Sequence, residues 1–422
     1  MKKVLSYLMT VALLVTACEG GEEPGGTDDG YTDIEYDSGE CGVQPMTGIA
    51  LRTDNQNCEN GNYGTQLEYA LIRFSDVCSQ KDIYDWSCVD AILFKAAWRK
   101  RQVILRFYYS YPGEPSAVPD YIKQLPDYGE SHEMIEQKEV YFPDWRSEEL
   151  QRFHIDFYRR LAERYDSDPR VAFIEVGLGF WSEYQLHLRL GGHTYPSEAF
   201  YEEWLTEMED SFQETPWCLS IESYLYGPFA VASNSYMKEY GFGIYDDSIL
   251  CEAFDSYNAK YWTRFGKDRY KRAPAGGEFC YCIEDDLQHG LDKEGIQGRT
   301  FESAVKQYHL SFLIGDEQPT YQSQARIIEA SKAMGYRFQL TRFAYKEGES
   351  ALMTIKNIGI APIYQDAFPA VDGVRSVFNL RSLMPGDSAT FTIATPSASA
   401  TSVPSVWCER LVLGQRIDLV SR

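Results

Sequence analysis

Short apolar runs rich in β-forming residues alternate along this chain with longer segments that carry a helical pattern. Runs such as 103–105 and 171–174 are apolar at every position, which is typical of parallel strands buried on both faces. Eight such runs within about 270 residues match the strand number and the size of a (β/α)8 barrel. The runs are 48–52, 68–76, 102–110, 171–179, 217–223, 242–248, 276–281 and 309–314.

The segments between these runs contain helix signals. Asp85 precedes apolar positions at the 3.6-residue period and a basic ending at 99–101, which predicts a capped helix. Ser147 and Ser197 are expected to begin two further helices. The segment 111–146 is too long for a plain connection, and on a barrel it would lie on the C-terminal face, where active sites are found.

After Gly335 the helical pattern stops and short strand patterns separated by turn signals follow. This change predicts a barrel over 43–335 and a small all-β, immunoglobulin-like sandwich over 336–422. The expected sandwich strands are 336–345, 350–356, 374–380, 389–394 and 411–420.

The N-terminus has the pattern of a bacterial lipoprotein. Residues 1–17 resemble a signal peptide, and small residues precede Cys18, which is the expected lipidation site; an ordinary secretory signal is the alternative. Residues 18–42 are acidic and glycine-rich, so a flexible tether is expected there. We therefore expect a protein that is lipid-anchored to the outer membrane and exposed on the cell surface, with periplasmic retention as the alternative.

The charge balance argues against nucleic acid as a partner. The chain has 63 acidic and 40 basic residues among 422, a net charge of −23. Nucleic acid needs a basic surface, so it is not an expected partner, whereas a neutral sugar is compatible with the acidic charge. Cys280-Tyr281-Cys282 lacks the CxxC spacing of zinc and redox motifs, and there is no nucleotide or serine-hydrolase motif. No metal and no cofactor are expected.

Two glutamates stand where a barrel glycosidase needs its carboxyl groups. Glu183 follows the fourth strand and Glu278 ends a Gly-Gly-Glu sequence in the seventh. Glycoside hydrolysis uses two carboxyls, one on each side of the bond that breaks. We therefore expect Glu183 and Glu278 to be the two catalytic carboxyls. Either one alternatively forms a structural ion pair, and Asp246 is the best substitute for Glu278.

Further candidates surround this pair. Glu175, in the middle of the fourth strand, is expected to be a buried, paired carboxylate rather than a catalyst. The remaining candidate binding residues are arginines at strand ends, which either neutralise the acids or bind substrate, and aromatic and histidine side chains, for which packing in the core is the alternative. They are Arg52, Arg73, Arg106, Trp181, Tyr184, His187 and Trp262.

The chain also resembles known barrels. Residues 67–76 and 84–90 are similar to the second strand and helix of clan A glycoside hydrolases. The segment from about 215 to 380 resembles an uncharacterised family of bacterial glycosidase-like barrels with a C-terminal sandwich, in the sequences around Gly243, Gly276, His309, Gly335 and Asn357. The resemblance implies glutamates on the fourth and seventh strands as acid/base and nucleophile. Clan A enzymes usually have Asn directly before the acid/base, and this chain has Ser182 there.

These observations predict a surface glycan-active protein, an O-glycosyl hydrolase acting on a neutral polysaccharide or oligosaccharide. The alternative is a non-catalytic glycan-binding lipoprotein on the same barrel. A third hypothesis is a scaffold whose sandwich docks a partner through an exposed apolar patch.

Overall fold

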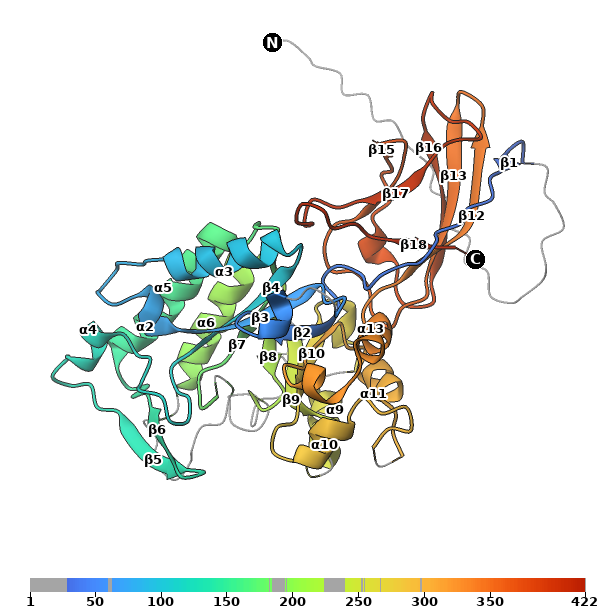
Figure 1. The fold of residues 1–422 in the computed structure, drawn as a ribbon. Helices are drawn as coiled ribbons and strands as arrows, with labels where there is room; N and C mark the ends of the chain where they lie inside the picture. The colour runs from blue at the N-terminus through green and yellow to red at the C-terminus, as the bar shows by residue number, and fades with distance from the viewer. Residues whose placement is uncertain are drawn as a thin grey trace, which may run out of the picture.

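Eight parallel strands close into a barrel in this computed structural model, which describes residues 29–59, 63–181, 183, 194, 196–223, 240–251, 253, 255–265, 267–296 and 298–421. The strands follow one another around the barrel in chain order, and the last pairs with the first (Figure 1). They are β2 (Gly48–Arg52), β3 (Leu67–Arg73), β4 (Gln102–Tyr108), β7 (Val171–Val176), β8 (Trp217–Ser220), β9 (Gly243–Ile249), β10 (Ala275–Phe279) and β11 (Phe312–Ile314). All eight predicted runs and the predicted (β/α)8 barrel are therefore confirmed.

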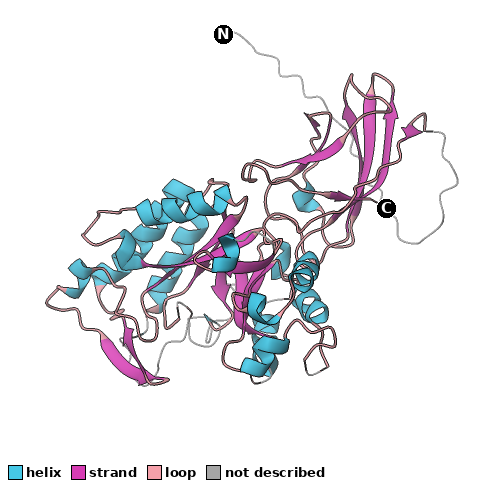
Figure 2. Ribbon diagram, in the orientation of Figure 1, coloured by secondary structure: helices cyan, strands magenta, loops and turns pink. Residues whose placement is uncertain are grey.

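Helices cover the outside of this barrel (Figure 2). The hydroxyls of Ser147 and Ser197 accept from the backbone N–H of Leu150 and Phe200, so both predicted caps are confirmed. Asp85 accepts from the N–H of Ser87 at 2.9 Å, but the residue directly before that helix is Trp86. The described helices are α1 (Gln56–Glu59), α2 (Phe74–Val77), α3 (Ser87–Trp98), α4 (Asp120–Lys123), α5 (Glu148–Tyr165), α6 (Glu198–Ser211), α9 (Asp255–Phe265), η4 (Arg269–Lys271), α10 (Glu284–His289), α11 (Phe301–Tyr308), α12 (Gln318–Tyr321) and α13 (Gln324–Lys332).

Two glycines let strand β10 pack closely inside the barrel. A Cβ atom on Gly276 would lie 2.1 Å from the ring of Phe312, which itself stacks on Phe173 across the barrel. A Cβ atom on Gly277 would lie 1.9 Å from the carbonyl oxygen of Asp246 in β9. The glycines are required because a larger residue at either position would displace β10, which carries Glu278 in its next position.

The long connection 111–146 contains a hairpin, β5 (Ser131–Ile135) and β6 (Lys138–Phe142), as well as α4. Val140 and Phe142 pack against Phe180 and Trp181, which follow barrel strand β7. The connection therefore lies at the C-terminal end of the barrel, as predicted.

The C-terminal region forms two β-sheets, antiparallel except that β18 pairs parallel with β12, as expected for a sandwich, although individual strands differ from the prediction. One sheet contains β12 (Phe338–Lys346), β13 (Ser350–Asn357), β16 (Ser388–Ala394), β18 (Leu419–Val420) and β1 (Thr32–Asp33). The second contains β14 (Phe368–Val371), β15 (Val374–Arg375) and β17 (Pro404–Trp407). Most of the predicted strand 374–380 is not strand, because its end forms the 3-10 turn η5 (Leu380–Ser382), and only the end of 411–420 is strand.

The described part of the expected tether is attached to this sandwich. Strand β1 pairs antiparallel with β12, and the guanidinium of Arg342 contacts Asp29 at 2.7 Å and Asp33 at 2.8 Å. The hydroxyl of Tyr36 donates to the carbonyl of Leu419 at 3.1 Å. The prediction of a flexible tether over 18–42 is therefore wrong for residues 29–42.

The sandwich packs against the N-terminal ends of the barrel strands. Arg410 donates to the carbonyls of Asp166 and Val171, and its own carbonyl accepts from Gln102 at the start of β4. Figure 1 shows the sandwich at one end of the molecule and hairpin β5–β6 at the other. The C-terminal face of the barrel thus lies on the side away from the sandwich. Among the described helices, none is both long and apolar enough to span a bilayer.

Candidate active site

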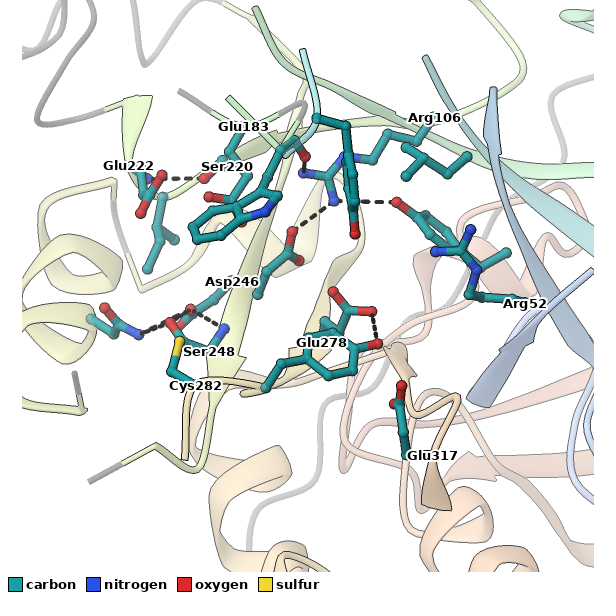
Figure 3. A pocket seen from close by; sticks show the side chains of 18 of the residues that line it. Arg52, Arg106, Glu183, Ser220, Glu222, Asp246, Ser248, Glu278, Cys282 and Glu317 are labelled. Atoms are coloured by element: carbon teal, nitrogen blue, oxygen red, sulfur yellow. Dashed lines mark hydrogen bonds and ion pairs between the residues drawn. The ribbon is translucent and has the colours of Figure 1, made fainter. Parts of the chain in front are cut away.

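A cavity of about 960 Å³ opens at the C-terminal end of the barrel strands. Residues from all eight strands or from the turns that follow them line it, together with Asn258 and Tyr261 of α9, and the tip of hairpin β5–β6 contributes Glu136. Glu183 and Glu278 both line this cavity, together with Arg106 (Figure 3). The structure therefore brings the two predicted catalytic glutamates to one site.

The turn after β7 fixes the position of Glu183. The carbonyl of Glu183 accepts from the N–H groups of Leu178 and Gly179 at 2.9 and 2.8 Å, which folds the chain back on itself. Trp181 within this turn has φ of +56°, a conformation that bulky residues rarely adopt. Arg106 donates to the Trp181 carbonyl at 3.1 Å and so supports the turn. The result is that Glu183 is held in the cavity wall, only 6% exposed.

Arg106 is the positive charge at the floor of the cavity. Its Nη1 lies 2.6 Å from Asp247 and 3.2 Å from Glu175, and its guanidinium lies over the ring of Tyr245. The side chain is 2% exposed. Of its two predicted roles, the structure shows the neutralisation of acids. The prediction that Glu175 is a buried, paired carboxylate is confirmed.

Burial and negative neighbours favour the protonated form of Glu183. Burial raises the pKa of this carboxyl well above its usual range, and the charges of Glu222 and Asp247 raise it further. Arg106 opposes the shift. A carboxyl that keeps its proton near neutral pH can act as a general acid.

Glu278 has a different set of neighbours. Burial, the largest effect, and the charge of Asp247 raise its pKa well above the usual range. The hydroxyl of Tyr281, which donates to Oε1 at 2.5 Å, and the charge of Arg106 oppose this shift. Because several carboxyls share one guanidinium, protons are distributed over the cluster as a whole, and the hydroxyl donor favours ionisation at Glu278.

Asp246 and Trp262 lie in a second environment, between β9 and α9. Asp246 accepts from Asn258 at 2.9 Å and from Trp262 Nε1 at 3.3 Å, and it is 2% exposed. Trp262 is 6% exposed and stacks on Tyr308. A sugar platform needs an open ring face, so the structure contradicts the prediction of Trp262 as a platform. Asp246 lines the cavity, but its carboxylate is already used in binding the helix.

The other predicted residues divide between the cavity and the structure around it. Arg52 and Trp181 line the cavity. Arg73 instead contacts Glu114 at 3.6 Å and the carbonyl of Pro115 at 3.2 Å, so it holds the 111–146 connection and does not line the cavity. Three predicted residues, Cys18, Tyr184 and His187, lie outside the described part of the chain. Ser182 lies outside it as well.

Sequence reasoning missed the tyrosines of the site. Tyr69, Tyr111 and Tyr281 line the cavity, and Tyr281 donates directly to Glu278. The available signal was the position of Tyr281 three residues after Glu278. Within the described residues, no three His, Cys, Asp or Glu side chains are grouped as ligands for a metal ion.

Comparison with known proteins gives structural neighbours only. No protein-family model and no curated protein matches the chain. An endo-glycoceramidase II from Rhodococcus sp. superposes with a TM-score of 0.45 at 13% identity, over 87% of this chain and 100% of that one. A family 39 glycoside hydrolase from Bacteroides cellulosilyticus has a TM-score of 0.43 at 10% identity, over 84% and 81%. A Pseudomonas stutzeri endoglucanase has a TM-score of 0.41 at 9% identity, over 69% and 96%.

These structural neighbours are glycoside hydrolases by their descriptions. With identities of 9–13%, the assignment of the barrel rests on the strand pairing of this chain itself. The chain is a (β/α)8 barrel with a C-terminal β-sandwich, and its cavity is lined by the buried Glu183, the half-buried Glu278 and one buried arginine, Arg106.

Proposed function

We propose that this protein is a glycoside hydrolase acting on a neutral polysaccharide or oligosaccharide. The observation that carries the proposal is the placement of Glu183, after the fourth barrel strand, and Glu278, at the end of the seventh, in the wall of one cavity. A two-carboxyl hydrolysis requires this convergence.

In the proposed reaction, Glu183 donates its proton to the glycosidic oxygen as the bond to the leaving sugar breaks. Glu278 attacks the anomeric carbon and forms a glycosyl-enzyme. Glu183, now ionised, takes a proton from water, and the resulting attack releases the sugar and Glu278. The raised pKa of Glu183 supports the acid role, and the hydroxyl of Tyr281 supports charge on Glu278.

The charges around the cavity favour an uncharged substrate. Seven carboxyl side chains line it, against the guanidiniums of Arg52 and Arg106. Arg106 is already paired with Asp247 and Glu175. An anionic sugar would therefore meet net repulsion, whereas a neutral sugar would not.

We further propose that the protein is anchored through lipidated Cys18 and faces the outside of the cell. The support is the sequence alone, namely the apolar leader and the small residues before the cysteine. Radiolabelled fatty acid incorporation into the wild type, and its loss in Cys18→Ser, tests the anchor. Protease accessibility on intact cells separates surface exposure from periplasmic retention.

Turnover tests the hydrolase proposal. The purified protein is assayed on a panel of neutral aryl glycosides and oligosaccharides, beside Glu183→Gln, Glu278→Gln and the exposed helix control Glu284→Gln. Hydrolysis that the first two substitutions abolish and the control retains supports the proposal. Binding without turnover, unchanged by either substitution, would assign the protein to glycan capture instead.

Chemical rescue assigns the two roles. With a dinitrophenyl glycoside, whose leaving group needs no proton, Glu183→Ala should still form the glycosyl-enzyme, and added azide should accelerate the breakdown of this intermediate. Glu278→Ala should release a glycosyl azide of inverted configuration, because azide enters the space of the missing nucleophile. Rescue of neither variant, with both correctly folded, would contradict the assignment.

A further inference from the structure

Three cysteines meet beside the cavity. Cys251 follows β9, and Cys280 and Cys282 follow β10; these neighbouring strands pair parallel, with Phe279 opposite Ile249. The thiol of Cys280 makes side-chain hydrogen bonds with both other cysteines. All three are reduced cysteines in this structure. The sequence spacing did not predict this cluster, because the contact with Cys251 is made only when the strands pair.

The three thiols differ in access. Cys251 and Cys280 are 0% and 1% exposed, whereas Cys282 is exposed and lines the cavity (Figure 3). The hydrogen bond from Cys280 lowers the pKa of Cys282 to about 7. A thiol that is accessible and substantially ionised near neutral pH is the form that attacks disulfides.

We propose that Cys282 is a thiol-modification site at the cavity rim, which takes the disulfides of small thiols, and that Cys280 resolves the adduct into a Cys280–Cys282 disulfide. The buried thiol is already in contact with its exposed partner, so the second step needs no large movement. Cys251, which follows the neighbouring strand β9 and also interacts with Cys280, is the alternative partner that the experiment must exclude.

The reaction balances with glutathione disulfide as the oxidant. The Cys282 thiolate attacks one sulfur of the disulfide, forming a mixed disulfide and releasing one glutathione thiolate. Cys280 then loses its proton and attacks the Cys282 sulfur, forming the protein disulfide and releasing the second thiolate. The two thiol protons end on the two glutathione thiolates, so two protein thiols are oxidised and one glutathione disulfide is reduced.

The modified residue lies next to the proposed catalytic group. Tyr281, which donates to Glu278, is the single residue between the two cysteines. A disulfide across Tyr281 constrains the backbone that aims its hydroxyl. An effect on turnover rests on the proposed function, but the thiol chemistry does not, so the test reads the chemistry directly.

The experiment treats the purified, folded protein with glutathione disulfide at pH 7, then blocks remaining thiols and digests without reduction. Chymotrypsin cleaves after Tyr281, between the two cysteines, so the two resulting peptides stay joined only through a Cys280–Cys282 disulfide. Mass spectrometry is expected to find this joined pair in the wild type and in the control Cys88→Ser, whose cysteine lies on α3.

Two variants separate the steps. Cys280→Ser should accumulate glutathione on Cys282, because the resolving thiol is missing, and Cys282→Ser should form neither the adduct nor a disulfide of Cys280. Circular dichroism confirms that each variant is folded, and Cys280→Ala serves if the serine variant is not. A Cys251–Cys280 disulfide that forms equally in Cys282→Ser, or no adduct on Cys282 in folded Cys280→Ser, would overturn the proposal.

Discussion

The hydroxyl of Tyr281 donates a 2.5 Å hydrogen bond to Oε1 of Glu278, within the cavity at the C-terminal end of the barrel. Tyr281 is 44% exposed and Glu278 is half-buried, so the bond lies where solvent and barrel interior meet. A donor to a carboxylate stabilises its ionised form. In the proposed hydrolase, this bond opposes the effect of burial and favours the ionised form that a nucleophile needs.

Removal of this donor should slow the proposed reaction. In Tyr281→Phe the pKa of Glu278 rises, because a bond to its charged form is lost, and the acidic limb of the pH profile moves to higher pH. A hydrogen bond to a charged group contributes about 1.5–3 kcal/mol, so kcat/KM should fall roughly 10- to 100-fold. Tyr321→Phe, an exposed tyrosine on α12, is the matched control. An acidic limb that does not move would contradict the role of Tyr281.

The alkaline limb should respond to Glu222. Its negative charge raises the pKa of Glu183. In Glu222→Gln that charge is removed, so Glu183 loses its proton at lower pH. The alkaline limb of the kcat/KM profile therefore moves to lower pH. The exposed Glu284→Gln variant should leave the limb in place. A shift of the alkaline limb to higher pH would show that Glu183 is not the acid whose titration it reports.

The buried ion cluster makes a prediction for stability. Arg106→Met leaves Asp247 without its cation, and breaking a buried pair costs about 3–5 kcal/mol. Arg52→Met is the control at the same cavity, because its side chain is 35% exposed and a pair of that kind contributes less than about 1 kcal/mol. Urea unfolding measures both. Equal losses in the two variants would mean that Arg106 is not a structural charge.

The barrel was predictable because its strands are apolar on both faces. Runs such as Val171–Val176 face the barrel interior on one side and the helices on the other, so hydrophobic length alone located them. The strands of the sandwich were harder to predict from the sequence. Strands β14 and β17 contain Pro369 and Pro404, which are poor strand signals, and β1 has two residues whose pairing with β12 depends on Arg342 far along the chain.

The site was predictable where a residue lies in the last positions of a strand or in the turn that follows it. Glu183 and Glu278 met that condition. The choice between Asp246 and Asp247 did not, because adjacent strand residues point to opposite faces and a shift of one register exchanges them. The pairing of β9 and β10 is irregular between Gly277 and Phe279. The prediction favoured Asp246 as the catalytic substitute, whereas Asp247 is the residue that contacts Arg106.

Glu175 should make the protein more stable in mild acid. One guanidinium serves two buried carboxyls, Asp247 is the closer at 2.6 Å, and burial raises the pKa of Glu175 to about 8. The unfolded chain has an ordinary glutamate pKa of about 4.3, so the folded state binds the extra proton between these values. The resulting stability is complete below about pH 4.3 and is lost as pH rises to about 8, by at most about 1.4 kcal/mol per unit.

Glu175→Gln isolates this contribution, because the amide keeps the shape of the protonated acid and does not titrate. Urea unfolding of the wild type between pH 5 and 8 should show a steeper decline in the free energy of unfolding than the variant shows, and the two slopes should converge above about pH 8. Glu198→Gln, on the solvent side of α6, should keep the wild-type slope. Parallel slopes in wild type and Glu175→Gln would mean that Glu175 is ionised throughout this range, with Arg106 holding both carboxylates in their charged forms.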